Sequence, residues 1–165
     1  MGEHASTFSL RKAVPEDAAS MARILKEIGW SERRNALPLE EVAHPIADLI
    51  RCASSSVDHD IMVAEDDEGE VLGFTAVHWV PFIMLGSTEG YVTDMFVSPS
   101  ASGRGVGKAL IGWVMEEGRR RGCMRLMVTN GKDKPSYRRG FYGKLGWTER
   151  PKVANFVYYY REPWS

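Results

Sequence analysis

The chain has 165 residues, 44% of them hydrophobic and 26% charged, which is typical of a soluble globular domain. A net charge of −1 argues against bulk attraction to nucleic acid or to an anionic membrane, and no apolar run approaches the roughly 20 residues that span a bilayer. Cys52 and Cys123 flank no CxxC motif and the four histidines show no ligand spacing, so we expect neither a disulfide framework nor a metal site.

The N-terminal third is expected to combine one strand with helices. Residues 1–7 are polar and predict a flexible N-terminus without a signal peptide, which favours a cytoplasmic protein, and residues 8–165 are expected to form one domain. Residues 8–13 alternate between apolar and polar and predict a strand. Between Pro15 and Gly29 apolar residues recur at the helical period, so we predict a helix that the glycine ends.

The middle of the chain predicts a second helix and a hairpin. A loop over 29–40 precedes a helical pattern that contains Pro45, which either begins the helix or kinks it. The apolar runs 61–65 and 71–80 flank the polar turn DDEGE and predict an antiparallel hairpin. A further loop is expected over 81–88.

The remaining elements complete a mixed sheet. Strands are predicted at 90–97, 124–129 and 155–161, and helices at 106–121 and 136–145. The order of elements therefore indicates an α/β fold of the α+β type, one mixed sheet with helices on both faces.

A glycine-rich loop between the strand at 90–97 and the next helix is the main functional signal. A Mg-triphosphate loop would need a glycine at 102 and a hydroxyl at 109, but the residues are Ser102 and Ala109. A dinucleotide loop would need a third glycine at 108 or 110, where the chain has lysine and leucine. Backbone N–H groups of such a turn, followed by a helix N-terminus, suit a pyrophosphate. The alternative is a strand–helix connection that binds no ligand.

The segment from Ser102 to Gly107 resembles the acetyl-CoA motif of the GNAT N-acetyltransferase superfamily, Gln/Arg-x-x-Gly-x-Gly/Ala. FYGKLGW at 141–147 and VAEDDEGEVLGF at 63–74 resemble further segments of that family. The resemblance covers about residues 8–162 and implies a mostly antiparallel mixed sheet flanked by helices on both faces. Ser102 departs from the family pattern, because it replaces a longer side chain that helps to hold the pyrophosphate.

The resemblance also implies the chemistry. Acetyl-CoA would be the co-substrate, without a metal, and a primary amine of a small molecule or peptide would attack it directly in a ternary complex. Neither nucleic acid nor membrane is an expected partner, and homodimers are common in the family. The alternatives are a non-catalytic CoA-binding or sensing domain of the same fold, and a nucleotide-binding protein that uses the same loop.

Residues implied to bind the cofactor come from three segments. The last strand residues before the loop would pair with pantetheine through their backbone, the loop would hold the pyrophosphate, and two residues further along would contact CoA. These residues are Met95, Phe96, Val97, Ser102, Gly103, Arg104, Gly105, Val106, Gly107, Lys108, Asn130 and Arg138. A backbone N–H of the 95–97 stretch would also hold the oxyanion.

Candidate catalytic residues are one tyrosine and two acids. By resemblance, Tyr142 would protonate the leaving sulfur; otherwise it is an aromatic core residue. Asp94 is the first candidate for the base, because an acid is unexpected in so apolar a strand, on the face expected to carry Val92 and Phe96. Its alternative is a salt bridge. Glu89 is the second candidate, and a solvated strand end is the favoured alternative for it.

The acceptor is expected to enter between the loops 29–40 and 81–89. Trp30 and Tyr91 are the predicted substrate-binding residues, with Trp79 and Phe82 as further aromatic residues that could line a partly apolar pocket. Each of these aromatics, taken singly, is more often a core residue.

Overall fold

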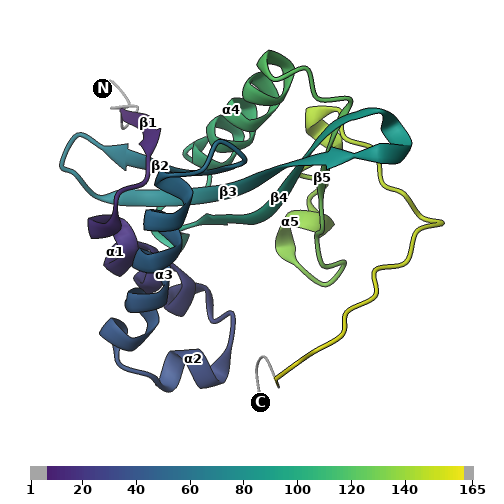
Figure 1. The fold of residues 1–165 in the computed structure, drawn as a ribbon. Helices are drawn as coiled ribbons and strands as arrows, with labels where there is room; N and C mark the ends of the chain where they lie inside the picture. Colours follow the sequence, from purple (N-terminus) through teal and green to yellow (C-terminus); the bar gives the residue numbers. More distant parts are fainter. Residues whose placement is uncertain (1–6, 162–165) are drawn as a thin grey trace, which may run out of the picture. The chain divides into compact units, whose positions relative to one another are not determined.

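The computed structural model describes residues 7–161 (Figure 1). The chain divides into two compact units, and the boundary in the sequence falls between Met127 and Val128. The flexible segment predicted for residues 1–7 lies, apart from Thr7, outside the described residues. That residues 8–165 form one domain stays a prediction.

The sheet has five strands in the spatial order of the sequence. They are β1 (Phe8–Lys12), β2 (His59–Asp66), β3 (Val71–Phe82), β4 (Ser87–Val97) and β5 (Arg125–Val128). The first four pair antiparallel with their neighbours. The expected mixed, mostly antiparallel sheet is confirmed.

Helices connect these strands along the chain. In the first unit they are η1 (Pro15–Asp17), α1 (Ala18–Ile28), α2 (Glu32–Ala36), α3 (Leu39–Ser54), η2 (Ile83–Leu85), η3 (Pro99–Ala101) and α4 (Val106–Arg120). Gly29 ends α1 with a φ of 70°, as predicted, and Pro45 lies inside an uninterrupted α3. The predicted loop 29–40 contains α2.

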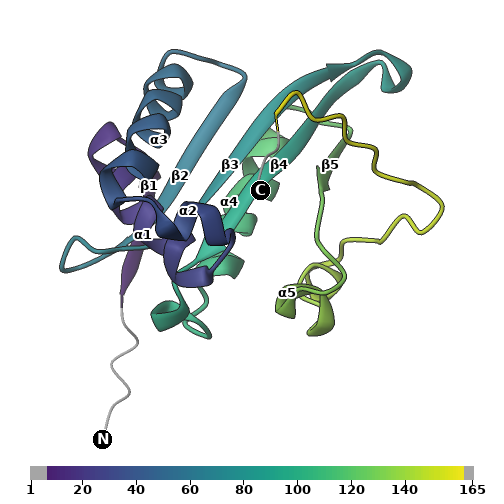
Figure 2. The same ribbon diagram turned by 90° about the horizontal axis from the view of Figure 1, so that it is seen from below.

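Half of the predicted loop over 81–88 is strand. β3 continues to Phe82 and β4 begins at Ser87, so that only a short turn separates them. The two strands run side by side as a long hairpin (Figure 2). Proline and glycine near the turn suggested a loop, but backbone pairing between the strands continues through Pro81, opposite Thr88.

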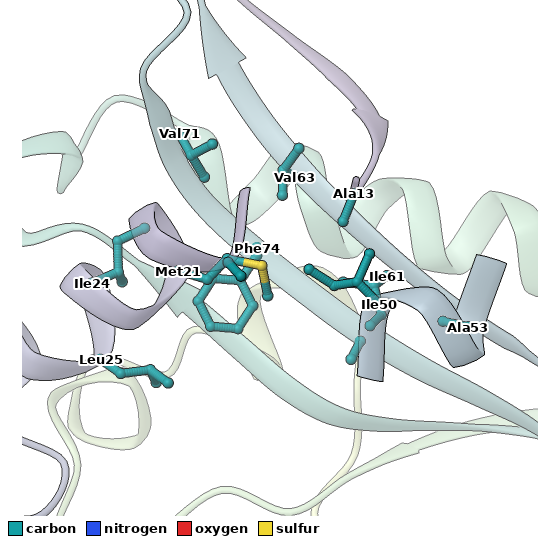
Figure 3. Packing of buried hydrophobic residues seen from close by; sticks show 12 residues of the cluster. Ala13, Met21, Ile24, Leu25, Ile50, Ala53, Ile61, Val63, Val71 and Phe74 are labelled. Atoms are coloured by element: carbon teal, nitrogen blue, oxygen red, sulfur yellow. The ribbon is translucent and has the colours of Figure 1, made fainter. Parts of the chain in front are cut away.

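Helices cover both faces of the sheet, as predicted. On one face, α1 and α3 pack on strand residues such as Ile61, Val63 and Phe74 (Figure 3). On the other face, α4 contributes Val106 and Leu110 to a cluster with strand residues of opposite parity. Because successive strand residues point to opposite faces, each strand supplies both cores.

A β-bulge in β4 changes which residues share a face. Asp94 pairs with Ala76 and Val92 pairs with Val77, so that Thr93 is an extra residue in β4. Asp94 therefore shares the α1/α3 face with Phe96, as predicted, but Val92 points to the α4 face. The prediction that Val92 shares the face of Asp94 was wrong, because simple alternation does not hold across a bulge.

The second unit contains less regular structure than the sequence predicted. The expected helix 136–145 is two short turns, α5 (Pro135–Arg138) and η4 (Gly143–Leu145), separated by Gly140 with a φ of 66°. No strand forms over 155–161, where the aromatic side chains are exposed. Strand propensity depends on pairing and packing, so an aromatic alternating pattern does not suffice alone.

Candidate active site

The glycine loop forms an open cradle of backbone N–H groups before α4. Gly103 and Gly105 have φ values of 81° and 84°, a left-handed conformation that disfavours a side chain. The first bond of the helix runs from Ala109 N–H to the Gly105 carbonyl, 3.0 Å, so the N–H groups of 105–108 lie in the turn that makes no intrahelical bonds. The exposed Lys108 adds positive charge. The loop thus has the features of an anion site.

Ser102 and Val106 differ in the groups that they can offer to a ligand. Ser102 is exposed, so its hydroxyl is accessible to a ligand. Val106 is 1% exposed and packs in the core, so only its backbone is available. Its packing depends on Gly73, which the sequence analysis did not single out: a Cβ there would lie 2.7 Å from the Phe96 carbonyl oxygen and 3.1 Å from Val106 Cγ1.

The end of β4 extends beyond its neighbour β5. Met124 N–H donates to the Thr88 carbonyl at 2.9 Å, which places the start of β5 beside the start of β4. β5 has four residues and β4 has eleven. The stretch of Met95, Phe96 and Val97 therefore lies past the length of β5, where an extended ligand group could pair with the strand backbone.

The two candidate bases differ in their surroundings. Asp94 is half-buried; its backbone carbonyl accepts from Thr75 Oγ1 at 2.9 Å, and no residue within 7–161 forms a hydrogen bond or ion pair with its carboxylate. The alternative of a salt bridge is therefore not seen. Glu89 is 4% exposed and forms an ion pair with Arg125, so the solvated strand end favoured for it was wrong.

The predicted substrate-binding residues lie on the face of Asp94. Trp30 follows α1 and stacks edge-on against Phe96, with ring centroids 5.0 Å apart. Tyr91 pairs with His78 of β3 and is half-buried. Because the bulge lies between them, Tyr91 and Asp94 point to the same side of the sheet.

Of the two further aromatics, Trp79 points to the other face of the sheet. Trp79 is 2% exposed on the α4 face, where its indole N–H donates to Asp60 at 2.8 Å and Arg121 lies 4.7 Å from its ring. Trp79 is therefore a core residue. Phe82 lies under the guanidinium of Arg125, 5.0 Å from the ring centroid.

A stacked histidine pair near Asp94 was missed by the sequence analysis. His59 of β2 lies directly opposite His78 of β3, with ring centroids 3.9 Å apart and planes at 17°. Counting outward from the predicted turn pairs position 59 with position 77, and the register shift at Ala64/Glu65 brings His59 opposite His78 instead. Spacing along the chain alone, 19 residues, gives no signal of this contact.

In the second unit, Tyr142 is enclosed by aromatic side chains. Its ring lies 5.0 Å from that of Phe141 and 5.5 Å from that of Trp147. Burial raises the pKa of Tyr142 to about 12, so its hydroxyl stays protonated at neutral pH. This protonation state is the one that a general acid requires.

Other predicted residues of the second unit have local roles. Asn130 accepts from the Ser136 hydroxyl at 3.0 Å, and Arg138 is exposed at the end of α5. Tyr137 donates to Glu149 at 2.8 Å, and Glu149 also pairs with Lys132. Tyr137 thus belongs to a local polar network.

Comparison with known proteins identifies the family. Residues 23–147 match the acetyltransferase (GNAT) family, and the chain belongs to this family of acetyltransferases. It is 27% identical to an aminoglycoside N(6')-acetyltransferase type 1 of Stenotrophomonas maltophilia, over 92% of this chain and 94% of the relative.

Two further relatives extend the comparison. A glucosamine 6-phosphate N-acetyltransferase 1 of Oryza sativa subsp. japonica is 31% identical over 59% of this chain and 58% of its own length. The crystal structure of a Trypanosoma brucei acetyltransferase has a TM-score of 0.69 and 27% identity, covering 92% of this chain and all of the other.

Residues 7–161 contain neither a membrane-spanning helix nor a cluster of metal ligands. None of the helices in this range has the length and apolar character needed to cross a bilayer. Nor does this range bring together three or more His, Cys, Asp or Glu side chains in a metal-binding arrangement.

Proposed function

We propose that the protein transfers an acetyl group from acetyl-CoA to a primary amine of a small molecule or peptide, by direct attack in a ternary complex. One observation carries this proposal. β4 ends at an open anion cradle, and Asp94, a carboxylate without a partner among residues 7–161, points to the same face as Trp30. A cofactor site and a candidate amine site are thus built on one strand.

Acetyl-CoA would be bound mainly through the backbone. The N–H groups at the start of α4 would hold the pyrophosphate, with charge from Lys108 and Arg104 and one hydrogen bond from Ser102. Pantetheine would pair with the 95–97 backbone. Asn130 and Arg138 would make further CoA contacts.

The transfer needs a neutral amine, a stabilised oxyanion and a proton for the sulfur. Asp94 would bind the acceptor ammonium and, directly or through water, promote its deprotonation. A backbone N–H of the 95–97 stretch would hold the oxyanion, and Tyr142 would protonate the thiolate as the C–S bond breaks. Glu89 remains the second candidate base, but its ion pair with Arg125 favours Asp94.

A small-molecule amine is the preferred acceptor class. The two curated relatives are named for aminoglycosides and for glucosamine 6-phosphate, both amino sugars. Trp30 is 42% exposed, and such an aromatic side chain offers a flat surface for a sugar ring. A cytoplasmic location and a homodimer complete the proposal.

A panel of amines tests the activity. Release of free CoA thiol from acetyl-CoA would be measured with aminoglycosides, glucosamine 6-phosphate, and peptides with free N-termini. We expect at least one amine to give turnover well above hydrolysis. Turnover no higher than hydrolysis for every amine would overturn the enzyme and leave the CoA-binding alternative.

Thermal stabilisation tests the cofactor separately. A ligand that binds only the folded state raises Tm, and the rise grows with the logarithm of its concentration relative to its Kd. We expect CoA to raise Tm and ATP and NAD to leave it unchanged. Stabilisation by ATP instead would favour the nucleotide-binding alternative.

A further inference from the structure

The stacked histidines lie on the same face of the sheet as the proposed amine site at Asp94. His59 on β2 pairs with His78 on β3, and His78 in turn pairs with Tyr91 on β4. On β3, His78 is two residues from Ala76, which pairs with Asp94. All four polar side chains point to the α1/α3 face, so an amine bound at Asp94 would lie within a short distance of the histidine row.

The stacking limits how many protons the pair can hold. Two imidazolium rings 3.9 Å apart would repel each other strongly, so one proton at most is favourable on the pair. Burial, and then the charge of His78, lower the pKa of His59, whereas Asp60 and Asp94 raise it to a smaller extent. The stacked geometry therefore favours a pair that carries no more than one proton.

The groups around the His59–His78 pair are consistent with a single proton on it. Asp60 lies on the opposite face of β2 and is occupied by Lys12 and Arg121. From β4 the titratable groups are Tyr91 and Asp94, with Glu89 further along in its ion pair. From α3, Ala53 and Ser54 lie near His59 and carry no charge.

We propose that His78, with His59 stacked on it, is the catalytic group that accepts the proton lost by the acceptor amine before it attacks the thioester. This inference rests on the proposed function and divides the work of deprotonation: Asp94 binds the ammonium and His78 takes its proton. A carboxylate is a weak base for an amine, whereas an imidazole that titrates near the operating pH is well matched to the task.

The proposed reaction releases one proton overall. The ammonium gives one proton to His78, which later releases it to solvent. The neutral amine forms the N–C bond, the C–S bond breaks, and a second N–H proton reaches the sulfur, in the proposed scheme through Tyr142. The products are the amide, free CoA thiol and one released proton, and neither oxidant nor reductant is needed.

The test is the pH dependence of kcat/KM for an amine that the panel identifies. His78→Gln should lower kcat/KM about 100-fold at neutral pH. The deficit should shrink as the pH rises toward the pKa of the amine, because more amine then arrives neutral. His59→Gln should also change the pH profile, because it removes the ring that is stacked on His78.

His44→Gln is the matched control, because His44 is an exposed histidine on α3 whose one ion-pair partner within residues 7–161 is Asp48. Its profile should match the wild type within twofold. If His78→Gln retains the wild-type profile, or if its deficit is the same at every pH, the inference is overturned while the proposed function stands. If the wild type acetylates no amine, the proposed function fails and the inference fails with it.

A measurement on the unmodified protein does not depend on how the variants fold. NMR titration of the histidine rings should show that one proton binds to the His59–His78 pair before the other at clearly separated pH values. Independent titration of both rings at the pH of His44 would overturn the inference.

Discussion

Two acids on opposite faces of the sheet, Asp60 and Asp94, have opposite surroundings. On the α4 face, Asp60 is 4% exposed and is held by Lys12, Arg121 and Trp79. On the α1/α3 face, the half-buried Asp94 has a carboxylate without a hydrogen bond or ion pair to any residue from 7 to 161. A desolvated carboxylate is costly unless it is compensated. The compensated acid therefore serves the fold, and the uncompensated one is available for a ligand.

The largest expected effect tests the compensated acid. Asp60→Ala should lower the free energy of unfolding by about 3–5 kcal/mol, because it leaves the buried Trp79 N–H without its acceptor and removes one of the two carboxylates that pair with the partly buried Arg121. Urea denaturation followed by tryptophan fluorescence measures this change. Asp60→Asn, which keeps an acceptor oxygen, should cost less. A loss below about 1 kcal/mol for Asp60→Ala would contradict the structural role.

For Asp94 we expect a small effect on stability and a large effect on activity. Asp94→Asn should change the free energy of unfolding by less than about 1 kcal/mol, because no partner in the described chain is lost. It should lower kcat/KM about 100-fold, because the ammonium loses its counter-charge. Asp48→Asn, at an exposed position on α3, is the control and should leave kcat/KM unchanged. Equal kcat/KM for Asp94→Asn and wild type would remove Asp94 from the site.

The same contrast extends to two tyrosines of the second unit. Tyr137 donates to Glu149, whereas the Tyr142 hydroxyl has no hydrogen-bond partner in the described part of the chain. Tyr142→Phe should lower kcat about 30-fold with little change in the Kd of CoA, and Tyr137→Phe should leave kcat nearly unchanged. Single-turnover kinetics and CoA titration measure the two quantities. An unaltered kcat for Tyr142→Phe would exclude it as the acid.

The pKa of Tyr142 adds a pH criterion. Burial raises this pKa from 10 to about 12, so the folded state keeps the proton at pH values where the unfolded state loses it. Titration of Tyr142 should therefore cause no decline of kcat below about pH 11. Its contribution to stability is full below pH 10 and is lost as the pH rises toward 12.

Local patterns in the sequence were sufficient for most of the fold. Helical periodicity with Gly29 as the stop defined α1, and the DDEGE turn defined the β2–β3 hairpin. The glycine spacing, set against the positions that other phosphate loops require, indicated an acyl-CoA cradle. These features depend on neighbours a few residues apart, which is why one sequence suffices to predict them.

Features that depend on pairing could not be predicted in the same way. The bulge at Thr93 is a shift in the register between β3 and β4, and it determines the face to which Val92 points. The contact of His59 with His78 follows from the same kind of register. The aromatic segment 155–161 has the composition of a strand, but composition does not supply a pairing partner.

The smallest expected effect is a pH dependence on the α4 face. Arg120 and then Arg121 donate to Glu117 and lower its pKa from 4.5 to about 2, against the opposing effect of burial. Because the folded pKa is depressed, the contribution of Glu117 to stability is complete above about pH 5 and is lost as the pH falls toward 2. Glu117→Gln should therefore cost about 1 kcal/mol at neutral pH, and the difference from wild type should shrink in acid. Urea denaturation at pH 7, 5 and 3 measures it, with Glu116→Gln as the control, since Glu116 forms one exposed pair with Arg119. A difference between Glu117→Gln and wild type that stayed constant from pH 7 to pH 3 would mean that Glu117 stabilises the helix by packing alone. Asp60 would then be the acid that supports the argument that compensated acids stabilise the α4 face.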